Sequence, residues 1–230
     1  KLEMRGKRRM IIEKINSPDN LKRLSDDELH TLTSEIRTAL ITKMSKLGGH
    51  MASNLGVVEI TVALHKVFNS PIDKIIFDVS HQSYVHKILT GRKEAFLYEE
   101  HFEDVSGYSN PEESSHDFFN IGHTSTSISL ACGMAKARDL KGDNENIIAV
   151  IGDASLDGGE AFEALNYAKE LHSGLIVVLN DNNMSIPENY GGLHDLLNTL
   201  RTNRGQVENN FFSSLGFEYK FVQDGHNLCE

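Results

Sequence analysis

A strand–helix–strand unit between residues 147 and 186 constrains the fold more than any other part of the sequence. The apolar run 147–151 predicts a buried strand, residues 158–168 have helical spacing, and residues 175–179 predict a second buried strand. Two parallel strands need a crossover connection of this kind, which is usually a helix. The sequence therefore predicts an α/β fold, with a parallel sheet flanked by helices.

Polar residues follow both predicted strands. Gly152 and Asp153 end the first strand, and Asn180 and Asn182 follow the second. Ligands bind at the carboxyl ends of parallel strands. Carboxylate and amide oxygens suit magnesium or calcium better than zinc, and magnesium commonly completes its shell with phosphate and water. The unit therefore predicts a site for a magnesium-bound diphosphate; the alternative is that these Asp and Asn residues only form turns.

Charge and cysteine content narrow the class of protein. The 230 residues suffice for one large domain or two small ones, and the formal net charge of -10 argues against a nucleic-acid partner. Cys132 and Cys229 lie far apart, fit no metal-ligand spacing and indicate a reducing compartment. No signal peptide and no apolar run of membrane-spanning length are visible. We therefore expect a cytoplasmic protein without a membrane partner.

Two helices are predicted in the N-terminal part of the chain. Ser25 and Glu28 have the spacing of a capping box, and the helix that they open ends at Gly48. His50 follows this helix, either as a turn residue or as a group directed into a site. Residues 56–68 predict a largely buried second helix.

The predicted strand 73–80 is followed directly by His81. A position at a strand end favours a functional role for His81, whereas His86, five residues further on, does not share a helical face with it. A zinc site is therefore weakly supported. The basic residues of this region could bind anions or lie on the solvated surface: Lys87, Arg92 and Lys93.

Residues 99–119 are polar and contain turn-forming glycine, asparagine and proline, so we expect a surface excursion. Gly122, His123 and Thr124 then lead through further hydroxyl residues into a helix. The amide groups of a helix N-terminus bind anions. The alternative is that the hydroxyl groups only cap the helix.

The C-terminal part carries fewer signals. Residues 187–209 are polar and glycine-containing, which predicts a mobile connection with a short helix at 194–200. Aromatic residues alternate with charged ones over 217–221, and this alternation predicts a short, half-buried strand.

Several motifs together resemble the 1-deoxy-D-xylulose-5-phosphate synthase family of thiamine diphosphate-dependent, transketolase-like enzymes. Gly-Gly-His-Met-Ala-Ser-Asn-Leu-Gly begins at Gly48, His-Gln-Ser-Tyr-Val-His-Lys-Ile-Leu-Thr-Gly-Arg at His81, and Gly-His-Thr-Ser-Thr-Ser at Gly122. The spacing from Gly152-Asp153-Ala154 to the asparagine pair is similar to the thiamine diphosphate-binding motif. The resemblance implies the thiamine diphosphate-binding fold, with residues 1–230 forming most of a single diphosphate-binding domain.

The resemblance also implies roles for individual residues. Asp153, Asn182 and the carbonyl of Met184 would hold magnesium. Residues that would meet the cofactor are His81, Gly122, His123, Thr124, Gly152, Asp153, Ala154, Ser155, Asn182 and Ile186. His50, His81 and His123 would be catalytic, by donating hydrogen bonds or moving protons.

The activity implied by the resemblance is a transferase reaction of isoprenoid and thiamine biosynthesis. Pyruvate condenses with glyceraldehyde 3-phosphate to give 1-deoxy-D-xylulose 5-phosphate, with loss of carbon dioxide. The pyrimidine-binding domain with its activating glutamate, and the C-terminal domain, have no counterpart in this chain, so we expect them in the same native chain or in a partner subunit. The resemblance also implies a homodimer.

Departures from the family pattern leave the substrate open. Ser80 replaces a usual glycine, Val85 a usual proline, and Asn54 a common serine. Two alternatives therefore remain: transketolase-like ketol transfer between sugar phosphates, or a non-catalytic module that retains the fold.

Overall fold

A three-stranded parallel sheet forms the centre of the computed structural model, which describes residues 10–184 and 189–228. The strands, in the order in which they pair, are β1 (Lys74–Phe77), β2 (Ile147–Gly152) and β3 (Ile176–Asn180). The longer helices are α2 (Asp26–Leu47), α4 (Val58–Val67), α7 (Ser127–Lys141), α9 (Gly159–Leu171) and α10 (Gly192–Thr202). The shorter ones are η1 (Ile12–Lys14), α1 (Pro18–Leu21), α3 (Met51–Leu55), α5 (Tyr84–Lys87), η2 (Ile88–Arg92), α6 (Glu94–Leu97), η3 (Glu99–His101), α8 (Asp153–Leu156) and α11 (Phe211–Ser214). The predicted α/β class is confirmed.

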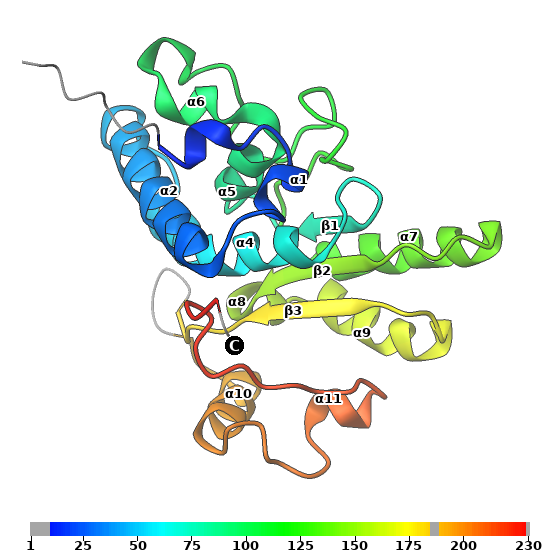
Figure 1. The fold of residues 1–230 in the computed structure, drawn as a ribbon. Helices are drawn as coiled ribbons and strands as arrows, with labels where there is room; N and C mark the ends of the chain where they lie inside the picture. The colour runs from blue at the N-terminus through cyan, green and yellow to red at the C-terminus, as the bar shows by residue number, and fades with distance from the viewer. Residues whose placement is uncertain (1–9, 185–188, 229–230) are drawn as a thin grey trace, which may run out of the picture.

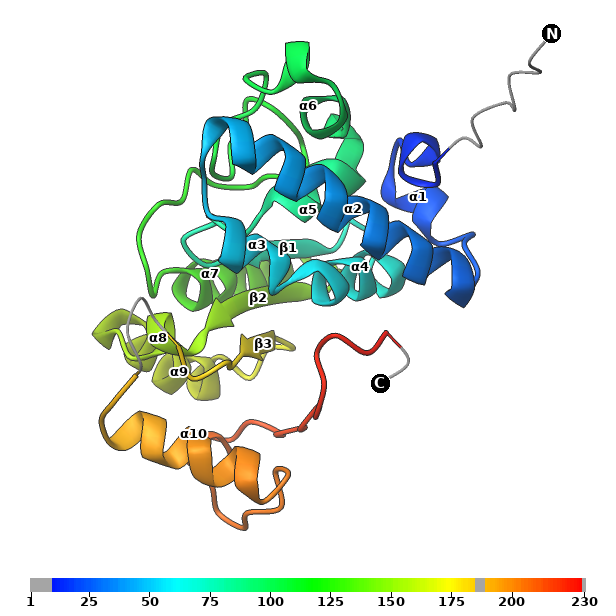
Figure 2. The same ribbon diagram turned by 90° about the vertical axis from the view of Figure 1, so that its left-hand side faces the viewer.

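Helices cover both faces of the sheet (Figures 1 and 2). Ala149 and Ile151 of β2 pack in one apolar cluster with α7 and α9. Ile148 and Val150, which point the other way, pack with Leu64 of α4. Because side chains alternate along a strand and both faces are covered, β2 is apolar at every position.

The N-terminal helices form a second core beside the sheet. The side chain of Ser25 accepts the Glu28 N–H at 3.3 Å, and Glu28 Oε2 accepts the Ser25 N–H at 3.0 Å, so the predicted capping box is confirmed. Helix α2 ends at Gly48, which has a φ of +76°, as a helix-terminating glycine does. The predicted helix 56–68 is α4, which packs between this core and the sheet.

Two predictions for the C-terminal half are wrong. β3 is not a buried strand: Ile176 is 39% exposed, and no strand of the described chain pairs with its outer edge. Residues 217–221 do not form a strand. They run alongside β3 (Figure 1), where Tyr219 stacks on Phe212 with the ring centroids 5.5 Å apart.

A groove of about 950 Å³ separates β3 from residues 217–228. Its walls are the apolar side of α4, including Ile60 and Leu64, one side of β3 and the C-terminal segment. His226 contacts Glu59 of α4, with Nδ1 and Oε2 2.9 Å apart, and so links the C-terminal segment to this helix. The groove explains why β3 has partly exposed side chains.

Replacing Ser25 tests the start of α2. Ser25→Ala removes the acceptor for the Glu28 N–H, and we expect the free energy of unfolding to fall by about 1 kcal/mol in urea denaturation. Ser34→Ala is the matched control, because Ser34 is exposed in the interior of the same helix and alanine has the higher helix propensity. A loss of equal size in both variants would contradict the capping role.

Candidate functional site

The ends of the three strands meet at one edge of the sheet. Phe77 pairs with Val150, and Gly152 pairs with Asn180. The residues that follow β1, β2 and β3 therefore emerge side by side, at the edge where parallel sheets bind ligands.

Asp153 is the first residue of α8, and its side chain is buried at the end of β2. Asn189 Nδ2 donates a hydrogen bond to Asp153 Oδ2 at 2.8 Å. Burial raises the pKa of Asp153, and the neighbouring charge of Asp181 raises it further. Because two carboxylates in a poorly hydrated site repel each other, a divalent cation held by oxygen ligands would favour the ionised form of Asp153.

The polar side chains of the loop after β3 make local contacts. Asp181, whose charge acts on Asp153, forms an ion pair with Arg201 of α10. Asn182 is exposed, and its Oδ1 accepts the Met184 N–H at 3.0 Å. The amide oxygen of Asn182, which was predicted to bind metal, forms a local turn in this structure. The neighbouring charge that raises the pKa of Asp153 comes from Asp181.

The remaining predicted metal and cofactor residues of this loop give less information. The Met184 side chain is 46% exposed, and Ile186 lies outside the described residues. In residues 10–184 and 189–228, no three His, Cys, Asp or Glu side chains converge on a metal position. A cation here would therefore depend on Asp153 together with amide, carbonyl, water or ligand oxygens.

Residues 122–124 form an exposed turn before α7. Asp78, which directly follows β1 and is almost completely buried, accepts the N–H groups of Ser125 and Ser127 at 2.9 Å each. A carboxylate at this place satisfies the first amides and complements the helix dipole. Because these two amides are already paired, they are not available to the anion that was predicted to bind at the helix start. The exposed turn is the part left for a ligand.

His50 and His81 lie together at this edge. Their ring centroids are 5.1 Å apart, with the planes at 76°. Burial lowers the pKa of His81, and the nearby His50 lowers it further, so His81 is neutral at pH 7. Its Nδ1 is buried and has no hydrogen-bond partner within the described chain. A neutral imidazole with an unpaired nitrogen can exchange a hydrogen bond or a proton with a ligand.

His123 is exposed on the turn before α7. Within the part of the chain that the structure describes, its ring contacts neither His50 nor His81. The structure therefore brings two of the three predicted catalytic histidines together. Ala154 and Ser155 are half-buried in α8, and Ser155 contributes its carbonyl to a hydrogen bond from Ser125 Oγ at 2.7 Å.

Asn54 joins the segments of the two paired histidines. Its side chain is fully buried, and Nδ2 donates to the carbonyls of both His50 and His81 at 2.8 Å. Oδ1 accepts the Tyr84 N–H at 3.0 Å. A serine, which is common here in the related family, has a single O–H donor and could not bridge both carbonyls. This departure from the family pattern therefore has a structural role.

The turn before His81 has strained backbone. Val79 and Ser80 have φ values of 58° and 68°, a region that β-branched residues in particular avoid. Ser80 Oγ donates to the Ile121 carbonyl at 3.0 Å and accepts the Ser109 N–H at 2.9 Å. Serine in place of the usual glycine thus adds two hydrogen bonds that hold the strained turn in place.

The second half of the motif that begins at His81 is structural. Lys87 is fully buried and donates to Glu113 Oε2 at 2.6 Å. Arg92 donates to both oxygens of Asp117, at 2.7 and 2.9 Å, and His86 Nε2 lies 2.9 Å from Asp117 Oδ1. The expectation that Lys87 and Arg92 bind anions or lie on the solvated surface is therefore wrong.

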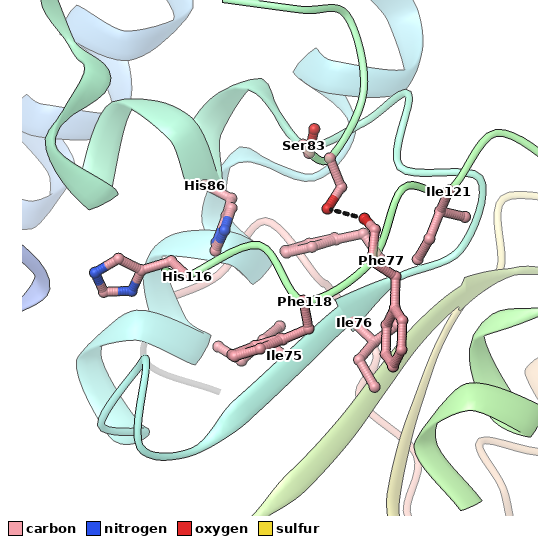
Figure 3. A pocket seen from close by; sticks show the side chains of 10 residues that line it. Ile75, Ile76, Phe77, Ser83, His86, His116, Phe118 and Ile121 are labelled. Atoms are coloured by element: carbon pink, nitrogen blue, oxygen red, sulfur yellow. Dashed lines mark hydrogen bonds between the residues drawn. The ribbon is translucent and has the colours of Figure 1, made fainter. Parts of the chain in front are cut away.

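Lys93 is also buried, and its Nζ donates to a main-chain carbonyl of the N-terminal segment at 2.7 Å. The predicted surface excursion 99–119 is confirmed, since most of its residues are exposed or half-buried in irregular structure; Glu113 and Asp117 anchor it to the interior through the ion pairs above. The end of this segment packs over β1 and leaves a cavity of about 10 Å³ between Phe77, His86 and Ile121 (Figure 3). A space of this size holds about one water molecule.

Several residues of the site were not predicted from the sequence. Asp78 falls inside the predicted strand 73–80, and it comes to lie at a strand end only because β1 stops at Phe77. Asn54 differs in the sequence only as a departure from the family pattern. Asp181 and Arg201 carry no separate signal, because their pairing depends on where α10 packs.

The parallel sheet flanked by helices defines an α/β protein, and its polar residues lie at the edge where sheets of this kind bind ligands. A family model described as 1-deoxy-D-xylulose-5-phosphate synthase matches residues 12–209. A protein of that name from Syntrophomonas wolfei is 57% identical over 84% of this chain, and one from Pelotomaculum thermopropionicum is 54% identical over 86%. The chain belongs to the 1-deoxy-D-xylulose-5-phosphate synthase family.

The chain spans 30% and 32% of the length of these two relatives. A third, from Caldanaerobacter subterraneus, is 46% identical over 256 aligned positions, which cover 96% of this chain and 41% of the relative. Because 96% of 230 residues is about 221, the relative carries about 35 residues in the aligned region that this chain lacks. In the described residues no helix is long and apolar enough to span a membrane.

The contact between α9 and the turn before α7 can be tested at Gly158. A Cβ on Gly158 would lie 2.5 Å from Ser125 Cβ, so Gly158→Ala must displace Ser125. We expect the free energy of unfolding to fall by about 1–3 kcal/mol in urea denaturation. Gly159→Ala is the control, because a Cβ there meets no atom within 4 Å; it should be neutral or stabilising. Equal losses would refute the steric explanation.

Buried histidines make stability depend on pH. Burial lowers the pKa of His65 and of His86, and it lowers the pKa of His116 to about 4. In the unfolded chain these rings take up protons near pH 6.5, whereas in the folded chain they take up protons only at lower pH. We therefore expect the free energy of unfolding to fall as the pH is lowered from about 6.5 towards 5.

Urea denaturation at a series of pH values measures this effect. His116→Gln should flatten the dependence over the stated range, because one of the perturbed rings is removed. His30→Gln, at an exposed position of α2, is the control and should leave the slope unchanged. A slope that is the same in all three proteins would show that His116 does not contribute.

Proposed function

We propose that this chain is the thiamine diphosphate- and magnesium-binding part of an enzyme that makes 1-deoxy-D-xylulose 5-phosphate. The reaction condenses pyruvate with glyceraldehyde 3-phosphate and releases carbon dioxide. Membership of the family supports the reaction class. The single observation that carries the cofactor proposal is Asp153, a buried carboxylate at the carboxyl edge of the sheet, close to the charge of Asp181.

The donor set at this edge fits magnesium. Asp153 supplies a carboxylate, and the loop after β3 supplies the amide of Asn182 and the carbonyl of Met184. Magnesium prefers such oxygen ligands and completes its shell with phosphate and water. Asn182 would have to release the Met184 N–H to direct its oxygen to the metal. The diphosphate would then lie beside Gly152, Ala154 and Ser155, where α8 begins.

His50 and His81, which follow other segments of the chain than Asp153, would act at the same edge of the sheet. Bound thiamine diphosphate supplies a carbon nucleophile for the keto group of pyruvate. His81 offers a neutral ring with an unpaired Nδ1, and His50 is exposed beside it, so the pair can hold or move a proton next to the reacting groups. His123 and its neighbours Gly122 and Thr124 would contact the cofactor from the turn before α7.

The proposal includes parts that this chain does not contain. The chain spans 30–41% of the relatives named above. A pyrimidine-binding domain with an activating glutamate, in the same native chain or in a partner subunit, would complete the cofactor site, and the assembled enzyme would be a homodimer. Release of carbon dioxide from pyruvate by the complete enzyme would separate this reaction from transketolase-like ketol transfer.

Calorimetric titration of this chain with thiamine diphosphate tests the site. We expect binding that requires magnesium, and Asp153→Ala should weaken it by at least about 100-fold, because removing even an outer-shell partner of a metal costs 10–100-fold. Asp157→Ala, an exposed carboxylate at the end of the same turn, should bind like the unchanged chain. Binding that is independent of magnesium, or unaffected in Asp153→Ala, would overturn the assignment.

A further inference from the structure

A third ring contacts the histidine pair. Tyr108 lies against His50, with the ring centroids 5.9 Å apart and the planes at 66°. His50 in turn contacts His81. The three rings therefore form a continuous row, from the half-buried His81 to Tyr108, which is 39% exposed. Edge-to-face packing of this kind fixes the relative orientation of aromatic rings.

The segment that carries Tyr108 is anchored on one side by a buried ion pair. Lys87 Nζ donates to Glu113 Oε2 at 2.6 Å, and Glu113 Oε1 accepts the Ser106 N–H at 2.7 Å. Ser106 Oγ then donates to the carbonyl of Tyr108 at 2.7 Å. Because Lys87 has no exposed surface and carries a charge, its only favourable state is the paired one. The position of Tyr108 is thus linked to the protein interior.

The other side of the segment is anchored to the strained turn before His81. The Ser109 N–H donates to Ser80 Oγ at 2.9 Å, and Ser109 Oγ donates to the Phe119 carbonyl at 2.9 Å. Hydrogen bonds therefore hold the backbone at Tyr108 and at its neighbour Ser109. A tyrosine on an exposed loop normally has many positions available, whereas this one is held over His50.

The pKa of His81 depends on what surrounds the ring. Within the described chain, the charged or titratable groups that act on His81 are His50, which lowers its pKa, and Asp78, which raises it; burial has the largest effect and lowers the pKa. His50 is itself exposed, and Tyr108 is the ring that covers one of its sides. Without Tyr108, His50 would be free to rotate away from His81, and water would take its place.

We propose that Tyr108 is a further positioning residue of this site, which holds the imidazole of His50 against His81. The inference rests on the proposed function for its catalytic meaning, because the two histidines matter for the reaction only if the cofactor binds at this edge. The arrangement of the rings can be tested without any cofactor, so its failure is distinguishable from a failure of cofactor binding.

The experiment is a proton NMR titration of the histidine side chains in this chain, without thiamine diphosphate. In the unchanged protein we expect a nuclear Overhauser contact between the rings of His50 and His81. Tyr108→Ala should abolish this contact, and the pKa of His81 should rise towards the ordinary value for histidine. Tyr108→Phe, which keeps the ring, should preserve both properties. Amide spectra remote from the site would show that each variant is folded.

The chain offers a matched control in Tyr98. This tyrosine is 44% exposed and contacts a surface histidine, His101, in the same edge-to-face manner, with centroids 6.4 Å apart. Tyr98→Ala should change the signals of His101 and leave His81 unaffected. The proposal is overturned if Tyr108→Ala leaves the contact and the pKa of His81 as they are in Tyr98→Ala, or if Tyr108→Phe is as disruptive as Tyr108→Ala.

A second variant tests the link to the interior. Ser106→Ala removes the hydroxyl that donates to the Tyr108 carbonyl and accepts from Lys87 at 3.3 Å. We expect a weaker contact between His50 and His81 and a change in the pKa of His81 in the same direction as in Tyr108→Ala. Ser115→Ala, at an exposed position of the same loop, is the control. No difference between the two serine variants would remove Ser106 from the proposal.

Discussion

The buried Lys87 and the largely buried Arg92 hold together the side of the molecule on which the histidines lie. Lys87 pairs with Glu113, and Arg92 pairs with both Glu113 and Asp117, so residues 87–92 hold a segment more than twenty residues further along the chain. Burying such charges costs several kcal/mol per ion unless each is paired. Because an unpaired buried charge would be this costly, the segment adopts a path that brings its carboxylates to the two cations.

Each side of the sheet edge is built from segments that are distant in sequence and joined by one buried polar side chain. Asp78 joins the end of β1 to the start of α7, and Asn54 joins the segments of His50 and His81. Both side chains are buried with their oxygens satisfied, so removing either would leave unpaired backbone amides or carbonyls. The edge is therefore prearranged before any ligand arrives, apart from the loop after β3.

The sequence predicted the sheet, the main helices and the position of Asp153 at the end of β2, because these depend on periodicity and on local capping. It predicted less well what depends on distant packing. Lys87 and Arg92 look like surface residues until the loop that covers them is known, and the alternation over 217–221 has the pattern of a strand but lies beside the groove. Asn182 has the correct chemistry, and its side chain orientation could not be read from spacing.

The open edge of β3 has a consequence for handling the protein. Unpaired N–H and C=O groups on a strand edge form hydrogen bonds readily with another chain. Solvent-exposed apolar side chains in the adjoining groove favour the same association. Native sheets protect such edges with charges, prolines or covering segments. Along β3 the side chains are Ile, Val, Val, Leu and Asn, without a charge. Colloidal stability of this chain in concentrated solution will therefore depend on what covers β3, more than on the net charge of -10.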